Sequence, residues 1–177
     1  MAKIASPFTD SIDGRIRQLR PSDLLQFRDH LLRLDRDSRR DRFNGTASDG
    51  FLCSYAERCF HDGTTVVGYL SREGLVLGAA ELHERPELAD TGEIAFSVEP
   101  GQQKRGIGRR LFRRLILHAH ALDYTRLLVT THPNNEAMKR LARTFEARLS
   151  FSDGSTMGEI ELHRADLDGV GEMRLSA

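Results

Sequence analysis

Apolar and polar residues follow two different periods along this chain. Runs with alternating or continuous apolar residues predict seven strands, over residues 15–20, 64–70, 75–83, 93–98, 126–131, 147–152 and 158–163. Apolar residues spaced three to four apart predict four helices, over residues 22–34, 48–60, 105–122 and 136–145. The resulting order β-α-α-β-β-β-α-β-α-β-β predicts an α/β domain of the α+β kind, with a mixed, largely antiparallel central sheet of about seven strands and about four helices.

Length and composition fit one globular domain. The chain has 177 residues, of which 39% are hydrophobic. We expect this domain to span residues 14–165, with a frayed segment over 1–13 and a tail over 166–177. The first residues lack the apolar region of a secretion signal, and no apolar run is long enough to cross a membrane. We therefore expect a cytoplasmic protein, either a monomer or a homodimer.

Charge and cysteine content exclude several classes of partner. The 26 basic residues balance 26 acidic residues, so no net charge points to a nucleic acid or a membrane surface. Arginines are nevertheless dense over residues 36–42 and 105–114, where they form either a solvated helix face or part of an anion site. Cys53 and Cys59 are too few for a zinc site, so we expect no metal.

A glycine-containing turn, residues 98–108, joins the strand 93–98 to the helix that follows. Such a turn leaves backbone N–H groups unpaired, and the helix dipole adds positive potential, so it predicts a phosphate or pyrophosphate site. Two familiar phosphate motifs do not fit. Gly108 is followed by Arg109 instead of the Lys-Ser/Thr of a Walker A loop, and Leu111 stands where a dinucleotide-binding motif has its third glycine.

Three segments resemble one protein family. Residues 103–108 match the Gln/Arg-x-x-Gly-x-Gly/Ala signature of the Gcn5-related N-acetyltransferase (GNAT) superfamily. Residues 131–141 resemble the family's Asn-x-x-Ala/Met-x-x-Leu helix after its fifth strand. Residues 34–43 resemble the Leu-x-x-x-Ser-Arg-x-x-Arg-Phe segment of bacterial members, including the acetyltransferase domains of protein-lysine acetyltransferases. The predicted strand order agrees with the GNAT fold over residues 16–162.

The resemblance implies an acetyltransferase that moves the acetyl group of acetyl-CoA to an amine, either a protein lysine or a small amine, by direct attack in a ternary complex. It also implies a set of cofactor-binding residues. The pyrophosphate would meet the backbone amides of Gln103, Lys104, Arg105, Gly106, Ile107 and Gly108, with charge-assisted contacts from Arg105 and Arg109. The pantetheine arm and thioester would meet backbone groups near Phe96 and Val98, and Asn135 would contact the pantetheine.

Amine transfer also needs a base, because a lysine-type amine has a pKa of about 10.4 in water. Glu93 is our first candidate, since related acetyltransferases often carry a catalytic glutamate in a Glu-x-x-Phe strand start. Glu81 on the preceding strand is the alternative, and Glu159 is third. His132 precedes Pro133 near the expected cofactor cleft, but a histidine in such a position is more typical of a solvent-facing loop residue.

One departure from the family bears on the leaving group. Many members have a tyrosine that protonates the CoA thiolate. When Asn135, Met138 and Leu141 are matched to the family's helix motif, Ala142 falls at the position of this tyrosine. The thiolate can still leave if water or a helix N-terminus stabilises it. The missing tyrosine keeps open a second hypothesis, in which the chain is a non-catalytic acyl-CoA-binding regulatory module.

Overall fold

The computed structural model describes residues 14–61, 63–88 and 90–163. Within these residues seven strands form one sheet in the order β1-β2-β3-β4-β5-β7-β6. The strands are β1 (Arg15–Gln18), β2 (Thr65–Leu70), β3 (Val76–Glu84), β4 (Thr91–Val98), β5 (Arg126–Thr131), β6 (Arg148–Ser152) and β7 (Ser155–Glu161). Every neighbouring pair is antiparallel except β4 and β5, which run parallel. The predicted mixed, mostly antiparallel sheet is therefore confirmed.

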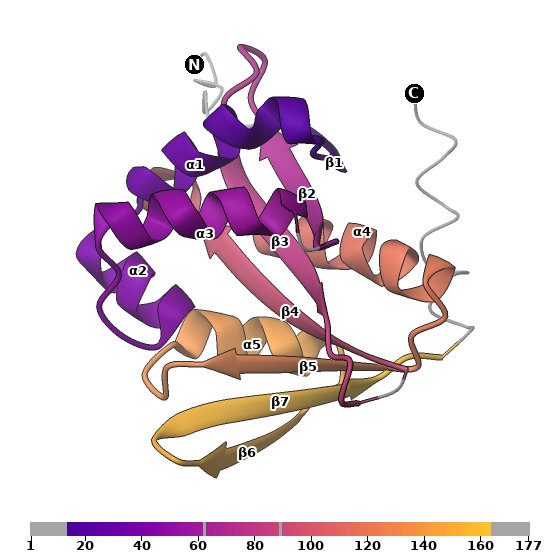
Figure 1. Cartoon of the computed structure of the whole chain (residues 1–177). Helices are drawn as coiled ribbons and strands as arrows, with labels where there is room; N and C mark the ends of the chain where they lie inside the picture. Colours follow the sequence, from indigo (N-terminus) through magenta and orange to yellow (C-terminus); the bar gives the residue numbers. More distant parts are fainter. Residues whose placement is uncertain (1–13, 62, 89, 164–177) are drawn as a thin grey trace, which may run out of the picture.

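Helices cover both faces of this sheet (Figure 1). One layer holds α1 (Leu24–Leu32), α2 (Arg36–Phe43) and α3 (Asp49–His61), and the other holds α4 (Ile107–Ala121) and α5 (Glu136–Thr144). Short 3-10 turns over Pro21–Asp23 and Pro100–Gln102 precede α1 and the loop before α4. None of the helices in the described part of the chain has the length and apolar character needed to span a bilayer.

The described residues form five α-helices where the sequence predicted about four, and the additional helix is α2. This helix has no buried residue, so no apolar face appears in its sequence. It begins where the Asp35 carboxylate accepts a hydrogen bond from the Ser38 amide at 2.8 Å. Arg39 then fixes it to the end of α1 by donating to the backbone oxygens of Leu32 and Leu34, at 2.7 and 2.9 Å. Polar contacts therefore hold the first part of α2, and Phe43 at its end packs against the rings of Phe51 and Tyr55 in α3.

Two strand boundaries also differ from the prediction. β4 begins at Thr91, two residues before the predicted start at residue 93. β7 begins at Ser155 instead of 158, because Asp153 and Gly154 both adopt left-handed backbone conformations and close a tight hairpin turn. The expected frayed segment 1–13 and the tail 166–177 lie outside the described residues.

The sheet separates two hydrophobic cores. The larger core lies between the sheet and the α4–α5 layer and includes Ile94, Leu111, Phe112, Leu127 and Met138. The smaller core lies under α1 and α3 and includes Phe27, Leu31, Leu52, Val66 and Ala79. Side chains alternate along β4, so Ile94 and Phe96 face the larger core whereas Glu93 and Ser97 point to the opposite layer. β4 therefore presents apolar side chains to the α4–α5 layer and polar side chains to the α1–α3 layer.

The two parallel strands separate in the middle of the sheet. β4 and β5 pair only at Thr91–Arg126, Gly92–Leu127 and Glu93–Leu128. Beyond Glu93 both strands continue, β4 to Val98 and β5 to Thr131, without pairing to each other. The sheet is therefore open between the last halves of β4 and β5.

Candidate active site

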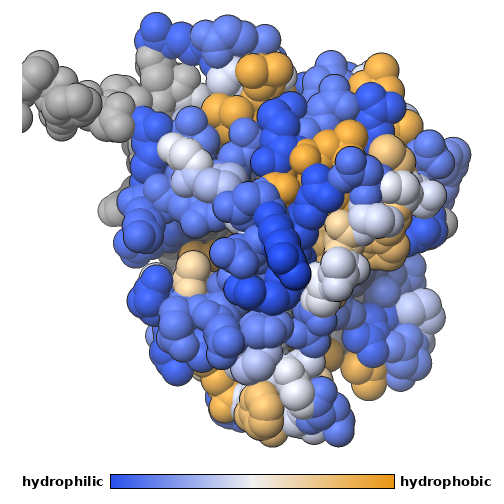
Figure 2. Space-filling view, turned by 90° about the vertical axis from the view of Figure 1, so that its left-hand side faces the viewer, coloured by the Kyte–Doolittle hydropathy of each residue, from blue (hydrophilic) through white to orange (hydrophobic). Residues whose placement is uncertain are grey.

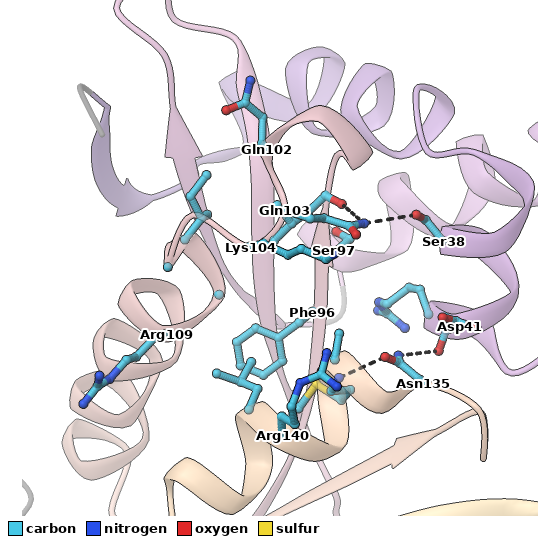
Figure 3. A pocket seen from close by; sticks show the side chains of 18 of the residues that line it. Ser38, Asp41, Phe96, Ser97, Gln102, Gln103, Lys104, Arg109, Asn135 and Arg140 are labelled. Carbon is cyan, nitrogen blue, oxygen red and sulfur yellow. Dashed lines mark hydrogen bonds between the residues drawn. The ribbon is translucent and has the colours of Figure 1, made fainter. Parts of the chain in front are cut away.

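A cavity of about 390 Å³ lies at the opening between β4 and β5 (Figure 3). Four elements contribute to its walls: α2, the end of β4, the turn that begins α4, and α5. The side chains and backbone that line it belong to Ser38, Asp41, Arg42, Phe96, Ser97, Val98, Gln102, Gln103, Lys104, Gly106, Ile107, Gly108, Arg109, Asn135, Ala137, Met138, Arg140, Leu141 and Thr144. The cavity therefore joins the glycine-containing turn to the region where a strand could add between β4 and β5.

The turn before α4 presents backbone donors to this cavity. Lys104 and Gly106 have positive φ angles of 60° and 79°, which reverse the chain immediately before the helix. Gly106 occupies the N-cap position of α4, and no side chain caps the helix there. The first N–H groups of a helix have no intrahelical acceptor, and the helix dipole favours an anion near them. The turn thus has the donor set that a pyrophosphate needs.

The edge of β4 supplies further backbone groups. The Glu99 amide donates to the Leu77 carbonyl on the β3 side at 3.0 Å. Because backbone groups alternate in direction along a strand, those of Phe96 and Val98 point toward the opening. The Val98 carbonyl accepts a hydrogen bond from Gln103 Nε2 at 3.0 Å. The opening is therefore lined by strand backbone on the β4 side.

Helix α2 spans the opening from the opposite layer. The Asp41 carbonyl accepts hydrogen bonds from Thr131 Oγ1 at 3.3 Å and from Asn135 Nδ2 at 3.4 Å, on the β5 side. Gln103 Nε2 donates to Ser38 Oγ at 3.4 Å, on the β4 side. Figure 3 shows Gln103 and Asn135 reaching α2 from two sides of the cavity.

The molecular face shown in Figure 2 is mostly hydrophilic, with apolar side chains visible between the polar ones.

The structure brings the predicted cofactor-binding residues together, with one exception. Phe96, Val98, Gln103, Lys104, Gly106, Ile107, Gly108, Arg109 and Asn135 all line the cavity. Arg105 does not; its Nη1 donates to Gln102 Oε1 at 2.9 Å. The side chain of Arg109 extends along α4, away from the other labelled residues (Figure 3).

Glu93 lies on β4 outside the cavity lining. Its carboxylate accepts a hydrogen bond from Arg85 Nη1 at 2.7 Å, and its side chain is about one-third exposed, at 31%. It sits beside His83 of β3 in the strand register. Glu93 thus belongs to the sheet face that carries α1–α3, one step before the point where β4 leaves β5.

Glu81 is fully buried at the centre of a polar cluster. Its Oε2 accepts from Arg42 Nη2 of α2 at 2.6 Å and from the Tyr55 hydroxyl of α3, and it lies 3.2 Å from His83 Nε2. Burial alone would raise the pKa of Glu81, but Arg42, His83 and Tyr55 outweigh it and lower this pKa to about 2. A carboxylate with so low a pKa is a weak base, so the geometry favours Glu81 as a structural anchor of α2.

The sequence prediction missed a second polar cluster, centred on His30 of α1. This residue is completely buried, and its Nε2 lies 2.9 Å from Ser97 Oγ. Its Nδ1 lies 3.1 Å from Glu99 Oε1, and Glu99 also accepts from Arg33 Nε at 2.9 Å. Burial lowers the pKa of His30 despite the nearby carboxylate. Because His30 and Ser97 are 67 residues apart, no local spacing could have revealed the contact.

Other candidate residues lie away from the cavity. Glu159 pairs with Arg126 at 3.1 Å, and His132 Nδ1 accepts from the Asn134 amide within its own loop at 3.2 Å. Ala142 is buried in the larger core. Among the side chains that the structure describes, no group of three or more His, Cys, Asp or Glu is arranged to hold a metal ion.

Comparisons with known proteins identify the family and support the fold. The model of the acetyltransferase (GNAT) family matches residues 24–146. The GNAT domain of the Streptomyces lividans protein PAT superposes with a TM-score of 0.73 at 19% identity, covering 84% of this chain and 90% of that one. No curated protein sequence matches the chain significantly.

Two further structures with bound ligands have the same fold. The putative acetyltransferase yncA from Salmonella typhimurium, solved with acetyl-CoA, has a TM-score of 0.63 at 19% identity and covers 86% of this chain and 95% of its own. Spermidine N-acetyltransferase from Vibrio cholerae, solved with CoA and spermine, has a TM-score of 0.65 at 18% identity and covers 84% and 95%. Because the family model matches most of the sequence, this chain belongs to the acetyltransferase (GNAT) family and is an acyltransferase.

Proposed function

We propose that this enzyme transfers the acetyl group of acetyl-CoA to an amine by direct attack within a ternary complex. The observation that carries the proposal is the opening between β4 and β5. It ends at the turn before α4, so one cavity offers both an anion site and a strand edge. Acetyl-CoA has the two matching parts, a pyrophosphate and an extended pantetheine arm.

The residues around the cavity suggest how acetyl-CoA is held. The backbone amides from Lys104 to Gly108 would bind the pyrophosphate, whereas the Gln103 amide already donates to the Pro100 carbonyl at 3.4 Å. Arg109 would add charge from α4. Arg105 lies outside the lining, so its proposed contact would require its side chain to leave Gln102. The backbone of Phe96 and Val98 would pair with the pantetheine arm and polarise the thioester carbonyl. Asn135 would face the arm from the β5 side.

A protonated amine must lose a proton before it attacks the thioester. Glu93 is the better base of the two predicted glutamates, because it is partly exposed on the face opposite the CoA turn. Both glutamates pair with an arginine, but Glu81 has no exposed surface from which to reach an acceptor. The acceptor would therefore approach from the α1–α3 layer, with Glu93 removing its proton directly or through water.

The acceptor class is tested by acetyl-CoA turnover with a panel of amines. Lysine-containing peptides and proteins form one arm, and polyamines and amino acids form the other, with CoA release as the readout. Saturable, acceptor-dependent CoA release in either arm supports the proposal and identifies the acceptor class. If the protein binds CoA but no arm is turned over, the chain acts as an acyl-CoA-binding module instead.

The base assignment is tested with Glu93→Gln. We expect normal CoA binding and a loss of at least about tenfold in kcat. Glu87→Gln is the matched control, because Glu87 also pairs with Arg85, at 2.5 Å, but lies in an exposed loop. An unchanged rate in Glu93→Gln from about pH 6 to about pH 9 would exclude Glu93 as the base.

A further inference from the structure

Ser97, His30 and Glu99 are arranged as a nucleophile, a base and a group that orients the base. Ser97 lines the cavity with 6% of its surface exposed, and its Oγ is 2.9 Å from His30 Nε2. The other ring nitrogen of His30 is 3.1 Å from Glu99 Oε1. These are the contacts by which hydrolases activate a serine, and they recur on unrelated folds.

The surroundings of His30 fix its tautomer. A carboxylate can only accept a hydrogen bond, so Glu99 requires the proton of the ring on Nδ1. That leaves Nε2 free to accept the proton of the Ser97 hydroxyl. Arg33 holds Glu99 through Nε at 2.9 Å, and burial keeps His30 neutral by lowering its pKa. A neutral, oriented imidazole is the form that a general base needs.

Of the three residues, only Ser97 is among those that line the cavity. His30 has no exposed surface, whereas Ser97 contributes to the cavity wall together with Phe96 and Val98. Under the proposed function the backbone of Phe96 and Val98 would polarise the thioester carbonyl. A thioester held there would lie beside the Ser97 hydroxyl and would be separated from His30 by it.

We propose that Ser97 accepts the acetyl group as an ester and that water removes it, which gives the enzyme an acetyl-CoA hydrolase activity in the absence of an amine. This proposal rests on the proposed binding of acetyl-CoA in the cavity. It adds a covalent route for the case in which no amine occupies the acceptor side, and leaves the direct route to an amine unchanged.

Each step balances. Ser97 Oγ bonds to the thioester carbonyl carbon while its proton moves to His30 Nε2. The carbon–sulfur bond then breaks, and the CoA sulfur takes that proton, which leaves CoA as a thiol and an acetyl ester on Ser97. Water next gives a proton to His30 and bonds to the acyl carbon. The ester bond breaks, Ser97 Oγ recovers the proton, and acetate leaves with release of one proton to solvent.

The test measures CoA release and acetylation without any amine. Wild-type protein is mixed with isotopically labelled acetyl-CoA, quenched in acid and digested, and the peptide containing Ser97 is analysed by mass spectrometry. We expect acceptor-independent CoA release and a labelled acetyl group on Ser97. Ser97→Ala should lose at least tenfold more of the acceptor-independent rate than of the amine-transfer rate. Ser54→Ala, an exposed serine on α3, is the control and should leave both rates unchanged.

A second variant keeps the test decisive if Ser97→Ala folds poorly. Ser97→Cys supplies a thiol of similar size, and we expect it to accumulate label as a thioester on residue 97. The proposal is overturned if the wild type releases no CoA without an amine, or if neither the wild type nor Ser97→Cys carries label at residue 97. A different result would contradict the proposed function, namely a wild-type protein that does not bind CoA or that shows no amine-dependent turnover.

Discussion

The guanidinium of Arg42 and the carboxylate of Glu81 form an ion pair that joins α2 to the central strand β3. Their nearest atoms, Nη2 and Oε2, are 2.6 Å apart, and the carboxylate has no exposed surface. On one side Arg42 lines the cavity at the opening between β4 and β5. On the other side Tyr55 and His83 line a second cavity of about 340 Å³. The pair therefore positions the helix that spans the opening between β4 and β5.

Replacement of Glu81 by Gln should destabilise the protein strongly. Gln cannot neutralise Arg42, and a buried charge left without its partner costs about 3–5 kcal/mol. Chemical denaturation of the variant measures the free energy of unfolding. Glu57→Gln, an exposed glutamate on α3, is the control and should change this free energy by less than about 0.5 kcal/mol. Equal effects of the two substitutions would show that the ion pair does not hold α2.

The same pair should make stability depend on acid. The pKa of Glu81 in the folded protein is about 2, below its ordinary value of 4.5. A carboxyl with a lowered pKa adds stability above its unfolded pKa and loses it as pH falls toward the folded value. We therefore expect the free energy of unfolding to fall between about pH 4.5 and about pH 2.

The groups that face Glu81 are Arg42 from α2, Tyr55 and Cys59 from α3, and His83 from its own strand. Arg42 and Tyr55 keep their protons throughout this pH range, since the pKa of each is raised. Denaturation at a series of pH values checks the slope. If the slope over this range is as steep in Glu81→Gln as in the wild type, other carboxyls account for it.

The fold was predictable from sequence wherever packing produces a periodic pattern. Ile107, Leu111 and Leu115 repeat on α4 because that face enters the larger core, and the helix lies within its predicted range. α2 gave no such signal, because its one contact with a core is made by the partly buried Phe43 at its last position, and a single apolar residue makes no period. Its position depends on Asp35 and Arg39, whose contacts with backbone groups follow no hydrophobic period.

The candidate site was likewise predictable from sequence only in part. The turn from Gln103 to Gly108 is continuous in sequence, so its motif could be read directly. The contacts of Arg42 with Glu81 and of His30 with Ser97 join residues 39 and 67 positions apart. Only the pairing of β3 with β4 and the packing of α1 and α2 bring these side chains together. A single sequence therefore shows the anion turn but cannot show the polar clusters beside it.

Asn135 should have two separable roles. Its Oδ1 accepts from the Met138 amide at 2.9 Å and caps α5, while its Nδ2 donates to Thr131 Oγ1 at 2.9 Å and more weakly to the Asp41 carbonyl. Asn135→Ala loses both roles, and loss of the cap alone costs about 1 kcal/mol. Asn135→Asp keeps the cap but places a carboxylate against the Asp41 carbonyl.

We therefore expect Asn135→Asp to retain more stability than Asn135→Ala while still raising the KM for acetyl-CoA. Thermal unfolding and steady-state kinetics on both variants check these outcomes. A wild-type KM in Asn135→Asp would show that the amide group does not contribute to the CoA side of the cavity.

Gly106 should be required for its backbone conformation. Its φ of 79° lies in the left-handed region, where a side chain costs about 1–2 kcal/mol, and it precedes the first amide of α4. Gly106→Ala should destabilise the protein by about that amount and weaken CoA binding, because the turn must relax away from the geometry that directs its amides into the cavity. Gly101→Ala is the matched control: it lies in the same loop, has no positive φ, and a Cβ there would meet nothing within 4 Å. Calorimetric titration with CoA compares the two variants. Tight CoA binding by a folded Gly106→Ala protein would mean that the left-handed turn is not part of the pyrophosphate site.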